Sequence, residues 1–146
     1  MSGVLPGYAR AVAVFGTERA LYDGLGRMFE DVVDDPLVAP HLQRADTVVQ
    51  YRFADPAAVI TVDVRADGEP RAELGATLLA PEVVLSMDGD TAHRLFLGEV
   101  NLTVALARGQ IRRAGPVGKV LKLVPLLRPC VARYRAQMRA PAEVPA

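Results

Sequence analysis

The stretch from residue 81 to residue 127 restricts the fold more than any other part of the chain. Within it, an apolar strand over Val83–Met87 runs directly into Asp88-Gly89-Asp90-Thr91, which is typical of a turn that opens a helix. A helical segment over 91–107 and a short strand over 110–113 follow. This succession predicts helices that pack on a sheet.

The residues before this stretch predict one helix and then several strands. Thr17 is a suitable N-cap for the helix, and Asp34-Asp35-Pro36 ends it. Strands are expected over three further segments, 48–53, 60–64 and 71–79, and the strand over Val83–Met87 follows them as the fourth. Because short turns such as Ala66-Asp67-Gly68-Glu69 join consecutive strands, the pattern favours an antiparallel meander. The expected fold class is α+β, with a single, largely antiparallel five-stranded sheet covered by helices.

The last predicted helix, which follows Gly115-Pro116, carries an apolar stripe. Its members recur at helical spacing and are expected to face the sheet: Val120, Val124, Leu127, Val131, Tyr134 and Met138. Pro125 and Pro129 fall inside this pattern. Each is expected to remove a hydrogen bond and to bend or break the helix.

The length of 146 residues and the hydrophobic content of 51% predict one domain with a substantial core. We expect a lead-in segment over 1–16, a single domain over 17–139 and a flexible tail over 140–146. Trp is absent and aromatic residues are few, so aliphatic side chains must fill the interior. Such an interior is typical of an ordinary core, and it also suits a pocket for an apolar ligand.

The side chains that could carry chemistry form no recognisable catalytic set. His93 lies in a polar helix start, where we expect a solvated side chain. His41 has no Cys, His or Asp at metal-ligand spacing. Cys130 is the single cysteine, so no intramolecular disulfide can form, and we expect a buried thiol rather than a nucleophile. Asp88 and Asp90 are better explained by turn formation and N-capping than by acid–base catalysis. No catalytic residue, cofactor or metal site is expected.

Charge is distributed unevenly, although the formal net charge is zero. Residues 1–107 contain 16 Asp and Glu against 8 Lys and Arg, whereas residues 108–146 contain 9 basic residues and one acid, Glu143. Two interpretations are open. The two parts neutralise each other within the fold, or the basic part binds an anionic membrane surface, a phosphate-bearing ligand or an acidic partner. Nucleic acid is not expected, because only Tyr134 is interleaved as an aromatic residue with the basic ones.

Gly98-Glu99-Val100-Asn101 and the residues after it resemble a recurring pattern of the sterol carrier protein 2 family, which consists of small lipid-binding domains. The later members of the pattern are Ala105, Gly109-Gln110-Ile111, Gly115 and Lys122-Leu123. The family's segment reads glycine–lysine–x–asparagine–proline, so Glu99 and Leu102 depart from it. The resemblance extends from about Val48 to Leu127. It implies a helix, a meander, a helical patch, one more strand and a closing helix, in that order.

The resemblance also implies the binding and carriage of a hydrophobic small molecule, such as a lipid, a sterol or an acyl-like compound, in an apolar cavity between the sheet and the C-terminal helices. The side chains expected to line this cavity are Val62, Leu85, Met87, Phe96, Val100, Leu106, Val120, Val124, Leu127 and Val131. The alternative is an enzyme or accessory protein that acts on an apolar metabolite, such as a polyketide or sterol, in the same pocket. The expected partners are the hydrophobic ligand and an anionic membrane surface, and the expected location is the cytoplasm.

Overall fold

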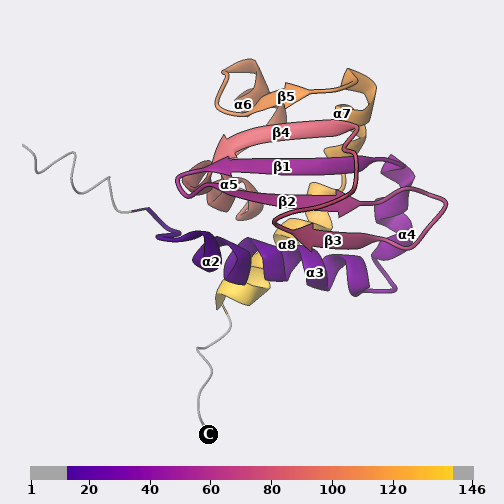
Figure 1. The fold of residues 1–146 in the computed structure, drawn as a ribbon, viewed down its shortest axis with the longest axis horizontal. Coiled ribbons are helices and arrows are strands. Elements are labelled where there is room, and N and C mark those ends of the chain that lie inside the picture. Colours follow the sequence, from indigo (N-terminus) through magenta and orange to yellow (C-terminus); the bar gives the residue numbers. More distant parts are fainter. Residues whose placement is uncertain (1–12, 140–146) are drawn as a thin grey trace, which may run out of the picture.

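The computed structural model describes residues 13–139, so most of the expected lead-in segment and all of the expected tail at 140–146 lie outside the described residues. One five-stranded sheet has the order β3-β2-β1-β4-β5 (Figure 1). The strands are β1 (Val48–Ala54), β2 (Ala58–Asp63), β3 (Arg71–Leu74), β4 (Val83–Asp88) and β5 (Arg112–Ala114). The helical segments are α2 (Glu18–Leu21), the π-helical turn η1 (Tyr22–Gly26), α3 (Arg27–Asp34), α4 (Ala39–Leu42), the 3₁₀ turn η2 (Gln43–Ala45), α5 (Gly89–Phe96), α6 (Leu102–Ala107), α7 (Val117–Leu123) and α8 (Leu127–Arg139). The predicted α+β class with a five-stranded sheet is confirmed.

The meander covers the first three strands and then stops. β1 pairs antiparallel with β2, and β2 pairs antiparallel with β3. β4 pairs in parallel with the other side of β1, and β5 pairs antiparallel with β4. The reason is the connection over 75–82. It crosses the sheet from the side where β3 ends to the opposite side, where β4 begins (Figure 1). β4 therefore runs in the direction of β1, and the prediction that it continues the meander is wrong.

The helix N-termini follow their local signals. The Thr17 hydroxyl accepts a hydrogen bond from the backbone N–H three residues later, at 3.1 Å, and the Asp88 carboxylate does the same at 2.7 Å. Both predicted N-caps are therefore confirmed. The segment predicted as one helix over 91–107 is divided into α5 and α6, because the Asn101 side chain caps a new helix with a bond of 3.0 Å.

The predicted last helix is divided into α7 and α8 at Pro125. Residues 124–126 form a turn, which shifts the buried face relative to one continuous helix. The buried side chains of this region are Val120, Leu123, Leu126, Cys130 and Tyr134. The inward assignment of Val124 and Met138 is wrong, because they are 36% and 45% exposed. Pro129 does not break α8, since it lies in the first turn, where backbone N–H groups have no partner within the helix.

Aromatic side chains from helices and sheet form the centre of the core. Phe29 of α3 packs against Tyr51 of β1 and Phe96 of α5, with ring centroids 5.0 and 5.2 Å apart. Figure 1 shows α3 along the β3 edge of the sheet, α7 beside β5 and α8 behind the strands. The core therefore lies between one face of the sheet and the helices, where a ligand pocket was expected.

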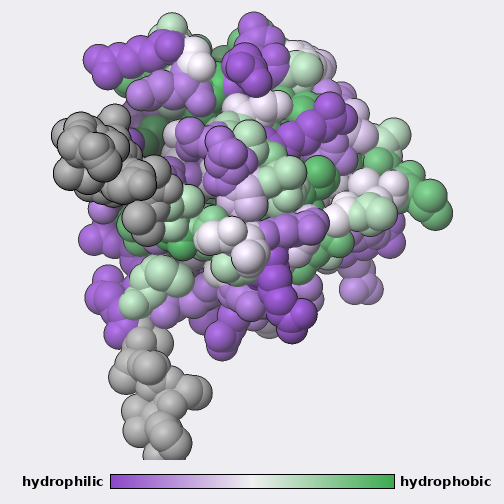
Figure 2. All heavy atoms as spheres, turned by 60° about the vertical axis from the view of Figure 1, so that its left-hand side comes forward, coloured by the Kyte–Doolittle hydropathy of each residue, from purple (hydrophilic) through white to green (hydrophobic). Residues whose placement is uncertain are grey.

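The surface is mixed in character. On the side drawn in Figure 2, hydrophobic residues (green) lie in small groups among hydrophilic ones (purple). Within residues 13–139, no helix combines the length and the apolar character that crossing a lipid bilayer requires.

Candidate functional site

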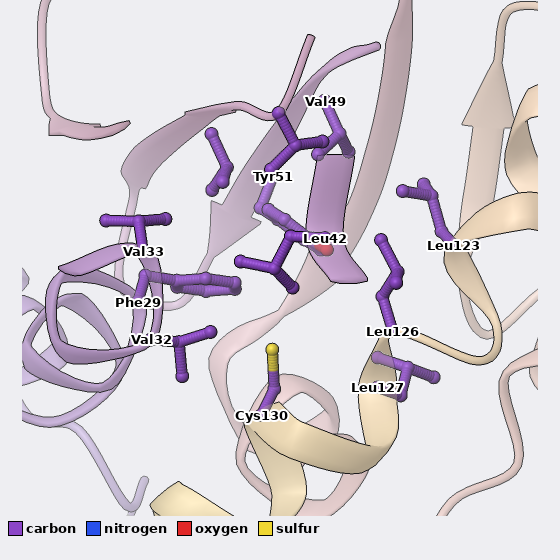
Figure 3. A pocket seen from close by; sticks show the side chains of 12 residues that line it. Phe29, Val32, Val33, Leu42, Val49, Tyr51, Leu123, Leu126, Leu127 and Cys130 are labelled. Atoms are coloured by element: carbon purple, nitrogen blue, oxygen red, sulfur yellow. The ribbon is translucent and has the colours of Figure 1, made fainter. Parts of the chain in front are cut away.

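A small apolar pocket lies between the sheet and helices α3, α4, α7 and α8 (Figure 3). Strand alternation directs Val49 and Tyr51 of β1 toward it. Helical spacing brings Phe29, Val32 and Val33 of α3 to another wall. The complete lining is Phe29, Val32, Val33, Leu42, Val49, Tyr51, Val62, Val64, Leu123, Leu126, Leu127 and Cys130. Segments about 100 residues apart in the sequence, α3 and the α7–α8 turn, thus share one cavity.

The pocket is small. Its cavity volume is about 30 Å³, which leaves room for very few water molecules. Pockets that hold drug-sized ligands measure roughly 300–1,000 Å³. One wall must therefore move before a lipid-sized molecule can enter. The turn over 124–126 lies outside regular helix and contributes Leu126 to the lining.

The chemistry of the pocket is that of a binding site. None of its lining residues is charged, and the side-chain heteroatoms are the Tyr51 hydroxyl and the Cys130 thiol. Burial raises the pKa of Cys130 to about 12, so the thiol stays protonated and is a poor nucleophile at neutral pH. Within residues 13–139, no three His, Cys, Asp or Glu side chains gather closely enough to hold a metal ion.

Polar contacts hold α8 in place behind the pocket. The Tyr134 hydroxyl lies 2.7 Å from Nδ1 of His93 on α5, and Gln137 donates to the Gly24 carbonyl at 2.8 Å. Burial lowers the pKa of His93, which favours the neutral ring beside this hydroxyl. His93 is therefore a structural contact between α5 and α8, and not a freely solvated residue.

The ten side chains predicted to line the cavity are placed in four settings. Val62 and Leu127 line the pocket. Four are buried in the core away from it: Leu85, Met87, Phe96 and Val120. Three are partly buried: Val100 and Leu106, which pack against the core, and Val131, which lies over Gly98. Val124 is exposed and outside the pocket.

Sequence reasoning missed most of the lining. Helical spacing does predict that the α3 residues are buried, since they form the apolar stripe of the first helix. It does not predict that they line a pocket. Val49 and Tyr51 could have been found from strand alternation in β1. Leu123 lies three residues after the buried Val120 in α7, so helical spacing could have found it. Leu126 could not be found this way, because its inward direction depends on how the chain turns at Pro125.

Of the basic residues in the C-terminal part, Lys119 is the one that reaches acids among the described residues. Its Nζ lies 4.0 Å from the Asp46 carboxylate and 3.9 Å from that of Glu82, and it donates to the Asp46 carbonyl at 2.6 Å. Within residues 13–139, seven other cations of the last three elements form no ion pair: Arg112, Arg113, Lys122, Arg128, Arg133, Arg135 and Arg139. All seven are exposed. Neutralisation within the fold therefore explains a small part of the charge pattern.

The outward side of α7 is apolar. Val117 and Leu121 are 49% and 56% exposed, and Val124 follows on the same side, since the three are spaced four and three residues apart. Lys122 lies beside this stripe in the sequence and is also exposed. α7 and the following turn thus face the pocket on one side and present aliphatic and cationic groups to solvent on the other.

Comparison with solved structures finds this arrangement of elements in proteins of low sequence identity. The apo form of Sterol Carrier Protein 2 from Yarrowia lipolytica matches with a TM-score of 0.61 and 16% identity, over 74% of this chain and 94% of its own. The sterol carrier protein domain 2 of Helicoverpa armigera matches with a TM-score of 0.62 and 15% identity, over 77% of this chain and 88% of its own. The chain has the sterol carrier protein 2 fold.

Palmitated SCP2L2 from Aedes aegypti shares the sterol carrier protein 2 fold, with a TM-score of 0.54 and 18% identity over 72% of this chain and 92% of its own. No protein-family model matches the sequence, and no curated protein matches it. The resemblance based on residues 98–101 and their successors is therefore confirmed for the fold. In this sterol carrier protein 2 fold, the apolar pocket lies between the inner face of the sheet and the helices, where the cavity was expected.

Proposed function

We propose that the protein binds a hydrophobic small molecule, such as a lipid, a sterol or an acyl-like compound, between the sheet and helices α3, α7 and α8, and carries it. The observation that carries this proposal is an uncharged, apolar pocket between the sheet and the helices of a sterol carrier protein 2 fold. The protonated Cys130 thiol and the lack of an acid or base in the lining favour a carrier over an enzyme. The cytoplasm is the proposed compartment, where a single buried cysteine stays reduced.

Burial of apolar surface supplies the affinity in this proposal. Each methylene group removed from water contributes about 0.8 kcal/mol, so a chain of a dozen carbons gains on the order of 10 kcal/mol before the cost of association. Part of that gain is consumed in widening a cavity of about 30 Å³. The rigid sheet floor is retained, and the α7–α8 turn moves outward.

Binding of an environment-sensitive apolar dye tests the proposal. We expect a saturable response with one dye per chain, and displacement of the dye by lipids. Val62→Phe, which fills the pocket, is expected to weaken dye binding by at least about tenfold, whereas Val124→Phe on the exposed side leaves it unchanged. A linear, unsaturable response of the wild type across several apolar dyes and lipids would contradict the carrier function.

The docking partner we propose is an anionic membrane surface, contacted by the outward side of α7 and the turn after it. An aliphatic stripe next to Lys122, in a part of the chain whose exposed cations form no ion pair within residues 13–139, suits an anionic bilayer, since the stripe enters the interface and the cations meet lipid headgroups. The charge pattern thus supports the second of the two interpretations raised from the sequence.

Co-sedimentation with vesicles tests this docking. Vesicles of phosphatidylcholine mixed with phosphatidylglycerol are expected to bind the protein at least about fivefold better than phosphatidylcholine alone, because each basic residue near the surface contributes about 1 kcal/mol. High salt should weaken the binding. Leu121→Asp should reduce it, whereas Leu78→Asp, at a fully exposed position in the 75–82 connection, should not. Equal binding to both vesicle types at low salt would refute the docking proposal.

A further inference from the structure

The Tyr51 hydroxyl is the polar group at the floor of the pocket. Tyr51 lies in the middle of β1, the central strand, between Ile60 of β2 and Leu85 of β4. Its side chain is 5% exposed and lines the pocket. Figure 3 shows the Tyr51 side chain among the other lining side chains, near Val49 and Leu42.

Tyr51 differs from the other tyrosines of the described chain in its hydrogen bonding. The Tyr22 hydroxyl donates to the Glu18 carboxylate at 2.9 Å and accepts from the Val59 N–H at 3.1 Å, and the Tyr134 hydroxyl lies 2.7 Å from His93. The hydrogen bonds among residues 13–139 include none to the hydroxyl of Tyr51. Among residues 13–139 the fully enclosed side-chain atom without a partner is Gln137 Oε1, so the Tyr51 oxygen is not fully enclosed and keeps accessible surface. A hydroxyl left unpaired at the floor of an apolar cavity is therefore available to a ligand.

The surroundings of this hydroxyl restrict what it can accept. None of the residues that line the pocket carries a charge, and the neighbouring heteroatom is the Cys130 thiol. Burial raises the pKa of both groups, so both remain neutral at physiological pH. An ionised carboxylate or phosphate at this depth would be buried without a cation, which is far more costly than burying a neutral oxygen.

We propose that the pocket takes an apolar ligand whose inward end carries one neutral oxygen, a hydroxyl or a carbonyl, and that Tyr51 hydrogen-bonds this oxygen and so determines specificity. This inference rests on the proposed carrier function and narrows its ligand class. An anionic amphiphile is disfavoured with its charged group inward. The aliphatic remainder of the ligand lies against the α3 and α8 side chains, as any apolar ligand would.

Displacement of a bound apolar dye by two ligands of equal chain length, 1-dodecanol and dodecanoate, tests this assignment at pH 8. The wild type is expected to bind dodecanol more tightly than dodecanoate. Tyr51→Phe should weaken dodecanol binding about three- to tenfold, which is the contribution of one hydrogen bond, and leave dodecanoate and the dye unchanged. Its melting temperature should be unchanged or higher, because no hydrogen bond is lost.

Tyr134→Phe is the matched control, since it removes a buried hydroxyl that does have a partner and lies outside the pocket lining. It should lower the melting temperature and leave the ratio of dodecanol to dodecanoate affinity as in the wild type. Equal dodecanol affinity of the wild type and Tyr51→Phe overturns the assignment, and so does a preference for dodecanoate. If the wild type binds no dye at all, the carrier function itself fails. A melting temperature of Tyr51→Phe below that of the wild type also overturns the assignment, because it means that the hydroxyl has a partner within the protein.

Discussion

Replacing Leu123 with aspartate is expected to lower the free energy of unfolding by at least about 3 kcal/mol, enough to unfold a domain of ordinary stability in part. Leu123 is 3% exposed and lines the pocket from the end of α7. An ionised carboxylate there loses the packing of the leucine and is buried without a cation among the lining residues. Chemical denaturation followed by circular dichroism measures the effect.

The neighbouring residue provides the control for this substitution. Val124→Asp places the same charge one position later, on the exposed side of the turn, and should change stability by less than about 1 kcal/mol. If α7 and α8 formed one continuous helix with Val124 on its inner face, Val124→Asp would destabilise the protein more than Leu123→Asp. If Val124→Asp were the more destabilising of the two, the turn at Pro125 would be placed wrongly.

Gly115→Ala is the second substitution with a large expected effect. Gly115 has a φ of +111°, and an added Cβ would overlap the Glu82 carbonyl oxygen and lie 3.1 Å from Cα of Val83. The contact is with the backbone at the start of β4, which cannot yield without disturbing the sheet. We expect a loss of about 2–4 kcal/mol in unfolding free energy, measured by urea titration.

Gly109→Ala separates steric overlap from backbone strain. Gly109 also has a positive φ, +76°, but an added Cβ would meet nothing within 4 Å. Only the left-handed conformation is then penalised, at about 1 kcal/mol. If both variants lost the same unfolding free energy, the close approach of Gly115 to β4 would not contribute to the cost of the substitution.

The parts of the fold that could be predicted are those that depend on neighbouring residues. The caps at Thr17 and Asp88 and the strand after Pro81 follow from local turn chemistry and alternation. The direction of β4 does not, because it depends on whether the 75–82 connection turns back or crosses the sheet. No residue in that connection carries a signal for either path.

The sequence predicts an apolar pocket between the sheet and the C-terminal helices, and two of the ten side chains predicted for it line the pocket of the structure. A stripe such as that of α3 shows which side chains are buried, but not which of them border a gap. Which side chains line the pocket depends on how segments about 100 residues apart meet. Val124 was predicted to line it, but the chain turns at Pro125, so that Leu123 and Leu126 line the pocket and Val124 is exposed. The unpaired hydroxyl of Tyr51 has no signature in the sequence at all.

The two-sided character of the α7–α8 turn has a thermodynamic consequence. Leu123 and Leu126 face the pocket, while Leu121 and Val124 face outward from the same few residues. Under the proposed docking, a displacement of this turn that admits a ligand also changes how the outward stripe meets a bilayer. Linkage then requires reciprocity: the factor by which a membrane alters ligand affinity equals the factor by which the ligand alters membrane affinity. Ligand loading and ligand release would then both be governed by one coupling free energy, which depends on the end of α7 and the turn after it.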